Sequence, residues 1–287
     1  MKIARVFPRK TKMTPTNPDA YIGMPPGLLD IKYDEVHISC TFSRDIDVGM
    51  LARNWEKHGT VRIGGPAFGD PGGEFVPGRY IKEGVTITSR GCPRKCPWCY
   101  VPDREGKIRE LEIHAGNNVQ DNNLLACSKK HIKKVFEMLR SQRAIDFSGG
   151  LDCRLLRDWH IEELRSLKIH QIWLAYDNER YLPAVKKAAE KLTKYFKRDK
   201  LRCYCLIGYG DEKITTAETR LRTAWELGFL PFAMRYDGRF YYTKDWYDLT
   251  RNWCRQAITR GIMKGNKEQS VGLFTNHDSL TTKQEAV

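Results

Sequence analysis

The sequence predicts an α/β protein, namely a partial (β/α)6 TIM-like barrel with a small N-terminal β-α-β extension and a C-terminal helical extension. Strand-like runs recur at a spacing of about 30 residues, beginning near Val85, Val119, Ile145, Gln171, Leu201 and Pro231. Amphipathic helical patterns fill most of the gaps, which is the alternation typical of parallel β-α units. We therefore expect residues 1–80 to form the N-terminal part, residues 81–236 the barrel, and residues 237–287 the C-terminal extension.

The N-terminal part is expected to contain one short β-α-β unit. Residues 1–30 predict an irregular arm because prolines interrupt them, at Pro8, Pro15, Pro18, Pro25 and Pro26. A strand is predicted over 36–40, an amphipathic helix over 45–58 and a second strand over 61–65. The Gly/Pro-rich segment 67–77 is expected to link this unit to the barrel.

The barrel helices are predicted from apolar stripes at helical spacing. One stripe follows Ile132, Val135, Phe136 and Leu139, a second covers 159–167, and a third runs from Val185 to Phe196 after Pro183. Thr215 and Glu218 are expected to form a capping box for a helix that ends at Gly228. The first gap, residues 101–118, is polar and carries no helical stripe.

The C-terminal extension has one more stripe, which predicts a helix packed over the open side of the barrel. It follows Trp246, Leu249, Trp253 and Ile258. The polar segment from Lys264 onward is expected to be a mobile tail.

Charge and cysteine content narrow the class of protein. The net charge of +14 favours contact with polyanions or anionic ligands. The start is too polar for a signal peptide and there is no long apolar run, so we expect a cytoplasmic protein without a membrane span. Nine cysteines then do not indicate a disulfide framework. Cys203 and Cys205 lie in an apolar run and are interpreted as buried side chains rather than as a second metal centre.

The segment Ser89–Tyr100, SRGCPRKCPWCY, places Cys92, Cys96 and Cys99 in a C-x3-C-x2-C pattern directly after the first barrel strand. Thiolates this close in sequence can hold a soft metal centre, and an iron–sulfur cube normally takes four cysteines. With three, one iron keeps an open position. In such barrels the chemistry collects where strands end. The other predicted strand ends carry Asp121–Asn123, Gly149–Arg154, Asp177–Asn178, Gly208–Asp211 and Arg235–Asp237.

This cysteine pattern after a first barrel strand, with aromatic Trp98 before the third cysteine, resembles the radical S-adenosylmethionine superfamily over residues 80–236. The resemblance implies a [4Fe-4S] cluster whose open iron is chelated by S-adenosylmethionine. It also implies a one-electron reductant such as flavodoxin or ferredoxin, and a 5'-deoxyadenosyl radical that abstracts hydrogen from a substrate.

The resemblance assigns roles by position. Cys92, Cys96 and Cys99 are expected to ligate iron, and Trp98 to border the adenine. Asp177 matches the position on the fourth strand that often touches the ribose. The fifth-strand motif near the adenine corresponds to the segment that contains Gly208 and Gly210.

One family feature is missing, and its role must be given to other residues. Members commonly carry Gly-Gly-Glu at the end of the second strand, where it binds the amino group of the cofactor. Here Gly149–Gly150 follows the third strand instead, so Asp121 and Asn122 are assigned that role. Arg154 is expected to pair with the methionine carboxylate, because a guanidinium fork matches a carboxylate.

The N-terminal unit, with its Ile63–Pro66 sequence IGGP, is similar to the end of the cobalamin-binding domain of some members. That domain's Asp-x-His-x-x-Gly signature is absent from this sequence. We therefore interpret the unit as a remnant of a Rossmann-like domain, without cobalamin.

The substrate is left open between classes. Basic helical segments at 129–134 and 186–202, together with the aromatic run 239–247, favour a nucleic acid or a nucleotide. A second hypothesis is an enzyme that acts on a small metabolite or a peptide, with residues 237–263 as a lid. A third is an iron–sulfur protein without catalytic activity. A structural zinc site completed by His114 is the competing metal hypothesis.

Overall fold

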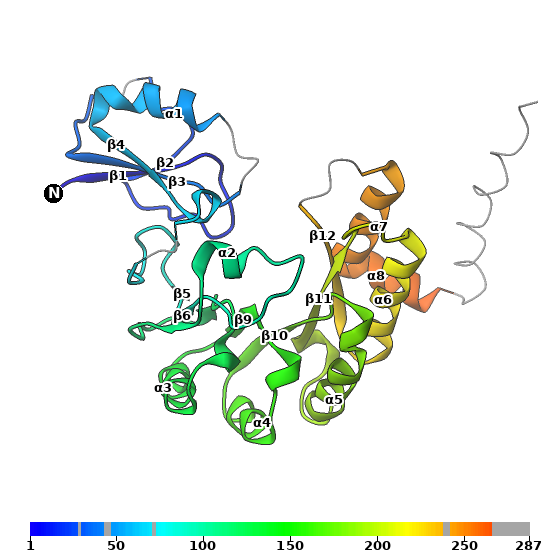
Figure 1. The fold of residues 1–287 in the computed structure, drawn as a ribbon. Coiled ribbons are helices and arrows are strands. Elements are labelled where there is room, and N and C mark those ends of the chain that lie inside the picture. Colours follow the sequence, from blue (N-terminus) through cyan, green and yellow to red (C-terminus); the bar gives the residue numbers. More distant parts are fainter. Residues whose placement is uncertain (28–29, 43–46, 71–72, 238–241, 266–287) are drawn as a thin grey trace, which may run out of the picture.

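The computed structural model describes residues 1–27, 30–42, 47–70, 73–237 and 242–265. Within them the chain is a mixed α/β protein with a four-stranded and a six-stranded sheet, and the strands of both sheets pair in parallel (Figure 1). In this described part no helix combines the length and the apolar character that crossing a membrane requires.

The four-stranded sheet belongs to the N-terminal unit and has the strand order β2-β1-β3-β4. These strands are β1 Ile3–Phe7, β2 Ala20–Ile22, β3 Glu35–Ser39 and β4 Thr60–Gly64. The predicted β-α-β unit corresponds to β3, α1 Val48–Trp55 and β4, and the 3-10 turn Glu56–His58 follows α1 directly.

The prediction of an irregular arm over residues 1–30 is wrong, because β1 is an inner strand of this sheet and β2 its edge. In β1 the fully buried Ala4 and Val6 alternate with partly exposed Ile3 and Arg5, and α1 lies against the same core through Leu51. The prolines act elsewhere, since three of them fall between the two strands: Pro8, Pro15 and Pro18. The prolines therefore indicate the connection between β1 and β2, and they led to the wrong prediction for the two strands on either side of it.

The six-stranded sheet has a strand at each of the six positions predicted from the sequence. It contains β5 Val85–Thr86, β8 Asn118–Val119, β9 Ile145–Leu151, β10 Ile169–Ala175, β11 Leu201–Ile207 and β12 Leu230–Arg235. The spatial order β12-β11-β10-β9-β8-β5 is the order in the chain, so each strand pairs with the next one along. Because all six strands run parallel, their carboxyl ends lie at the same edge of the sheet, and right-handed crossovers in chain order keep the connecting helices on one face.

Four helices fill the crossovers along the outer side of this sheet (Figure 1). They are α3 Lys129–Arg140, α4 Asp158–Arg165, α5 Leu182–Leu192 and α6 Ile214–Glu226. The predicted stripe of α3 is buried in full, at Ile132, Val135, Phe136 and Leu139. The predicted capping box of α6 is wrong: its N-cap is Lys213, so Thr215 already lies inside the first turn.

The first gap holds shorter elements that shape the cysteine segment. Strands β6 Ser89–Arg90 and β7 Arg109–Glu110 pair antiparallel, and α2 Val101–Glu105 lies between them in sequence. The three cysteines therefore lie in the loop between β6 and β7, and the pairing of these two strands holds the ends of the loop together.

Two C-terminal helices, α7 Lys244–Cys254 and α8 Gln256–Lys264, complete the described chain. The predicted stripe is buried at Trp246, Leu249 and Trp253, where α7 packs against β12 and α6. These side chains belong to the main core, so the stripe serves packing. The predicted mobile tail beyond Gly265 and the first part of the aromatic run, residues 239–241, lie outside the described residues.

The buried His160 of α4 predicts a pH dependence of stability. Its side chain is 2% exposed, and Nδ1 accepts a hydrogen bond from the Arg157 backbone N–H at 3.0 Å. Burial, with the charges of Arg157 and Lys191, lowers the pKa from 6.5 to about 4. The unfolded chain therefore binds this proton more readily than the folded one. The contribution of His160 to stability is present above pH 6.5 and is lost as pH falls toward 4, by roughly 3 kcal/mol in total.

Urea unfolding of the wild type and of His160→Gln at pH values between 7 and 4.5 measures how steeply the free energy of unfolding of each protein changes with pH. We expect His160→Gln to lose less stability on acidification, because glutamine does not titrate. Equal slopes for the two proteins would contradict the assignment.

Candidate functional site

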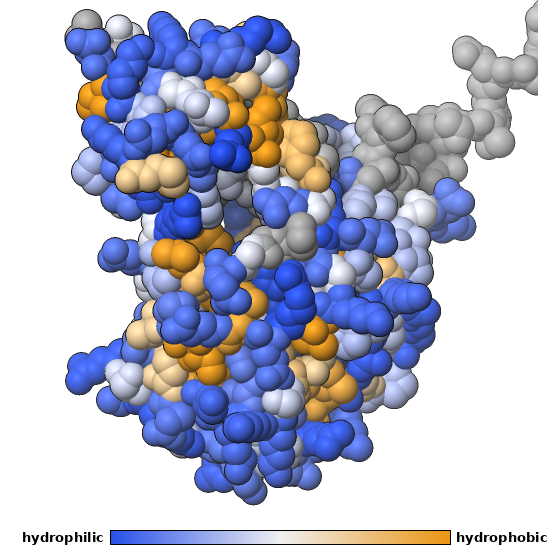
Figure 2. All heavy atoms as spheres, turned by 60° about the vertical axis from the view of Figure 1, so that its left-hand side comes forward, coloured by the Kyte–Doolittle hydropathy of each residue, from blue (hydrophilic) through white to orange (hydrophobic). Residues whose placement is uncertain are grey.

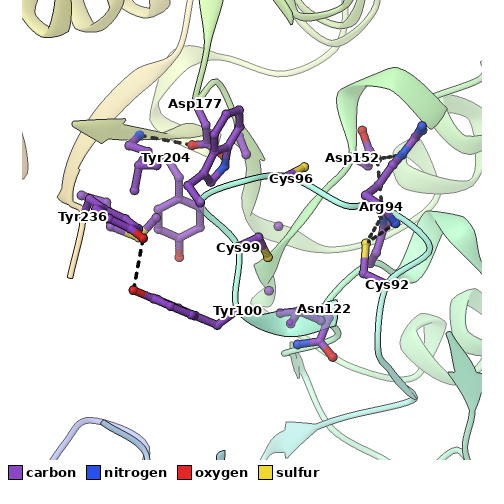
Figure 3. A pocket seen from close by; sticks show the side chains of 18 of the residues that line it. Cys92, Arg94, Cys96, Cys99, Tyr100, Asn122, Asp152, Asp177, Tyr204 and Tyr236 are labelled. Carbon is purple, nitrogen blue, oxygen red and sulfur yellow. Dashed lines mark hydrogen bonds and ion pairs between the residues drawn. The ribbon is translucent and has the colours of Figure 1, made fainter. Parts of the chain in front are cut away.

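The carboxyl ends of the six strands open onto a cavity of about 480 Å³. Cys92, Cys96 and Cys99 all line it, as Figure 3 shows. Residues that follow β8, β9, β10 and β12 line the remaining walls together with Tyr204 and Leu206 of β11, and Pro66 of the N-terminal unit closes one side. The sequence prediction that the cysteine loop meets polar strand ends is thus matched by the geometry.

Asp121, just after β8, anchors the start of the cysteine loop. Its carboxylate accepts hydrogen bonds from Thr88 N and Thr88 Oγ1, both at 2.6 Å, and from Ser89 Oγ at 2.7 Å. The side chain is 2% exposed and does not line the cavity. Burial raises the pKa of Asp121 against these hydrogen bonds, which favour the ionised form.

The neighbouring Asn122 holds the next residue of the loop and also faces the cavity. Its Oδ1 accepts a hydrogen bond from Gly91 N at 2.9 Å. Gly91 has φ +81°, and a Cβ at this position would overlap with the carbonyl of Lys107, so glycine is required here. Cys92 N then donates to Gly106 O at 3.1 Å, which ties the loop to the end of α2.

Two N–H donors point at the sulfur of Cys92. Arg94 N and Asn123 Nδ2 both lie 3.4 Å from Cys92 Sγ. The Asn123 amide also donates to Asp152 Oδ2 at 3.3 Å, and Arg94 Nε reaches the same oxygen at 3.3 Å. Asn123 is 4% exposed, and its Oδ1 is buried without a partner in the described structure.

The other two thiols have different surroundings. The Tyr181 hydroxyl lies 3.8 Å from Cys96 Sγ, and Cys99 N donates to Cys96 O at 2.9 Å. Burial raises the pKa of the Cys99 thiol, and the neighbouring Cys96 and Cys92 raise it further. A cation at this site would favour the thiolate instead.

Asp177, after β10, joins the cysteine loop to the fifth strand. Its Oδ1 accepts from Leu206 N at 3.2 Å, and the Trp98 indole also donates to the carboxylate. Burial raises the pKa of Asp177, while these two hydrogen bonds and the charges of Arg220 and Arg154 act to lower it. The side chain lines the cavity, so the carboxylate both orients Trp98 and faces the interior.

Arg154 is held by Asp152, two residues before it. The guanidinium donates to Asp152 Oδ1 from Nε at 2.6 Å and to Oδ2 from Nη2 at 2.9 Å, and it stacks on Tyr181 at 4.5 Å. Burial alone would raise the pKa of Asp152, but the hydrogen bonds and charge of Arg154, with that of Arg94, lower it. The Arg154 guanidinium, which was expected to bind the methionine carboxylate, thus binds the carboxylate of Asp152 instead.

The structure brings together some of the predicted site residues and separates others. Those that line one cavity are Cys92, Cys96, Cys99, Trp98, Asn122, Arg154 and Asp177. Asp121, Gly208, Gly210 and His114 are outside this lining. A Cβ at Gly208 would lie 2.7 Å from the Tyr242 ring, so this glycine serves packing against residues that precede α7.

Several lining residues were missed as site residues by the sequence reasoning: Arg94, Tyr100, Asn123, Asp152, Tyr181, Tyr204 and Tyr236. Asn123, Asp152 and Tyr236 stand at predicted strand ends, so their position was a usable signal. Tyr181 and Tyr204 carried none, because one begins a helix and the other is inside a strand.

Cys92, Cys96 and Cys99 are the thiols that face this cavity, so their sulfurs are the atoms there that could hold a soft metal centre. Among the described residues, no group of three or more His, Cys, Asp and Glu side chains lies close enough together to hold a metal ion. No protein-family model and no curated protein matches this chain.

Proposed function

We propose that this chain is a radical S-adenosylmethionine enzyme whose six-stranded sheet forms a partial barrel around a [4Fe-4S] cluster. One observation carries the proposal. The three cysteines of a C-x3-C-x2-C segment follow the first strand of a six-stranded parallel sheet in chain order, and all three line the cavity at the carboxyl ends of its strands.

The residues present fit a cluster at this place. Cys92, Cys96 and Cys99 supply thiolate ligands, and hydrogen bonds from Arg94 N and Asn123 Nδ2 to Cys92 would remain on the ligated sulfur. Donors on cluster sulfurs stabilise the reduced state and orient the ligand. The open iron position is then available to a second molecule in the cavity.

When bound, S-adenosylmethionine would supply a sulfonium whose 5'-carbon–sulfur bond is cleaved by one electron, from a flavodoxin or ferredoxin, to methionine and a 5'-deoxyadenosyl radical. The chain would hold this molecule through side chains that face the cavity. Asn122 offers an amide near the loop, Asp177 offers an ionisable carboxylate, and Trp98 offers an aromatic face. The protein's part is to orient these groups and to keep water from the reactive carbon.

Anaerobic reconstitution of the full chain with iron and sulfide tests the proposal. We expect visible absorption from a cluster, an electron paramagnetic resonance signal after dithionite reduction that changes when S-adenosylmethionine is added, and release of 5'-deoxyadenosine. Tight zinc without iron in anaerobically purified protein would contradict it. A cluster that forms but gives no 5'-deoxyadenosine would leave a non-catalytic iron–sulfur protein.

A further inference from the structure

Aromatic rings meet at the mouth of the cavity, on the side of Cys99. Tyr100 and Tyr236 stack with ring centroids 6.2 Å apart and planes 9° apart. Tyr209 contacts Tyr236 edge-on at 5.0 Å and Trp98 at 5.6 Å. We call these four residues the aromatic rim. Tyr100 is 39% and Tyr209 36% exposed, so part of the rim remains open to an incoming ring.

Two arginines lie over rings of the aromatic rim. Arg104 is 4.6 Å from the centroid of Tyr100, and Arg180 is 5.3 Å from that of Trp98. Within the described chain, neither guanidinium forms an ion pair with an acidic side chain. Their charge is therefore available to an anion next to the rings.

Trp98, Tyr100 and Tyr236 of the aromatic rim line the same cavity as Cys92, Cys96 and Cys99. Figure 2 shows a hollow between the N-terminal unit and the larger sheet, with apolar and polar side chains at its border. The cavity has the size of a small-ligand site, so one planar group can enter it while the chain that carries it stays outside. Tyr100 directly follows Cys99, so a ring stacked on the rim lies next to the cluster loop.

We propose that the aromatic rim binds a nucleobase of a single-stranded nucleic acid, with Arg104 and Arg180 near its phosphates. As a statement of the substrate class of the same cavity, this inference rests on the proposed function. A nucleotide combines a planar π face with a negative charge, which is what exposed rings and unpaired guanidinium groups recognise together. The net charge of +14 favours the same partner, and an aromatic peptide would satisfy the rings alone. A base within a duplex cannot reach such a cavity without leaving its stack.

Fluorescence anisotropy with labelled oligonucleotides of about 12 nucleotides tests this inference. The probes are single-stranded RNA, single-stranded DNA of the same sequence, and the corresponding duplex, with the full chain purified without cluster reconstitution. We expect both single strands to bind more tightly than the duplex, and the ratio of their affinities to show which sugar is preferred. Tyr100→Leu/Tyr236→Leu is expected to weaken single-strand binding by about 5- to 150-fold.

Two variants control for the loss of the tyrosine hydroxyl groups and for the loss of an exposed tyrosine elsewhere on the surface. Tyr100→Phe/Tyr236→Phe keeps both rings and is expected to bind within about twofold of the wild type. Tyr195→Ala removes an exposed tyrosine that also stacks with an arginine, Arg165, but lies just after α5. It is expected to leave binding unchanged.

Three results would overturn the inference: no single-strand binding, equal binding by the leucine variant and the wild type, or an aromatic peptide that displaces the oligonucleotide stoichiometrically. Loss of binding on charge reversal of Lys133 and Lys134 of α3, with no effect of the rim variants, would also overturn it. Oligonucleotide binding by the cluster-free chain is independent of the radical chemistry. Failure of reconstitution with intact binding would count against the proposed function alone.

Discussion

Replacing any one of Cys92, Cys96 and Cys99 by serine is expected to abolish stable cluster assembly and, with it, 5'-deoxyadenosine formation. In the proposed cluster each thiolate would hold a different iron, and the sequence around the loop offers no fourth cysteine as a substitute. The loss should exceed the roughly 10- to 100-fold effect of removing an outer hydrogen-bond partner of a metal ligand. Iron and acid-labile sulfide per chain, with visible absorption after anaerobic reconstitution, measure it.

The chain supplies matched controls among its other cysteines. Cys127 is partly buried outside the cavity lining, and Cys205 is fully buried in the main core. Neither thiol faces the cavity that Cys92, Cys96 and Cys99 share. Cys127→Ala and Cys205→Ala should therefore take up as much iron as the wild type. A loop variant that keeps its iron, or a control that loses it, would contradict the assignment.

The strand positions of the large sheet were predictable because their signal is local. Leu201–Ile207, for example, is an apolar run with Cys203 and Cys205 buried in the main core, and a helix follows it at the expected distance. Prediction from such local apolar runs failed at the N-terminus. There β1 and β2 are separated by a proline-rich connection, and β1 pairs with β2 on one side and with β3, found later in the chain, on the other.

The place of the three cysteines at the carboxyl ends of the strands was also predictable, whereas the contacts of the strand-end residues were not. Consecutive residues leave a strand in different directions, so three neighbours at one strand end have three different environments. Asp121 turns back to bind Thr88 and Ser89, Asn122 holds Gly91, and Asn123 reaches the sulfur of Cys92. A sequence identifies the strand end, but the path of the opposite loop decides which side chain meets the cavity.

Removing the carboxylate of Asp121 is expected to have the second large effect. In Asp121→Ala three donors, Thr88 N, Thr88 Oγ1 and Ser89 Oγ, lose their acceptor in a place from which water is excluded. Leaving buried partners of a charged group unsatisfied costs about 3–5 kcal/mol of unfolding free energy. Urea unfolding measures the loss, and iron uptake should fall although all three cysteines are present, because these bonds fix the start of their loop.

Asp146→Ala is the matched control for this effect. Asp146 also belongs to the large sheet, but its contact with His170 is partly exposed to water, so its removal should cost at most about 1 kcal/mol and leave iron uptake unchanged. An Asp121→Ala variant as stable as Asp146→Ala would show that the loop is held by other contacts.

The combination of Asp121→Ala with Ser89→Ala separates anchoring from a simple loss of stability. If the carboxylate acts through the Ser89 hydroxyl, removing that hydroxyl after the carboxylate costs less than removing it alone, because its acceptor is already gone. The two free-energy losses should then sum to more than the loss of the double variant, by about 1 kcal/mol or more. Strictly additive losses would mean that the carboxylate and the hydroxyl stabilise the protein independently. The link from the second strand to the cysteine loop would in that case run through Thr88 and Gly91 alone.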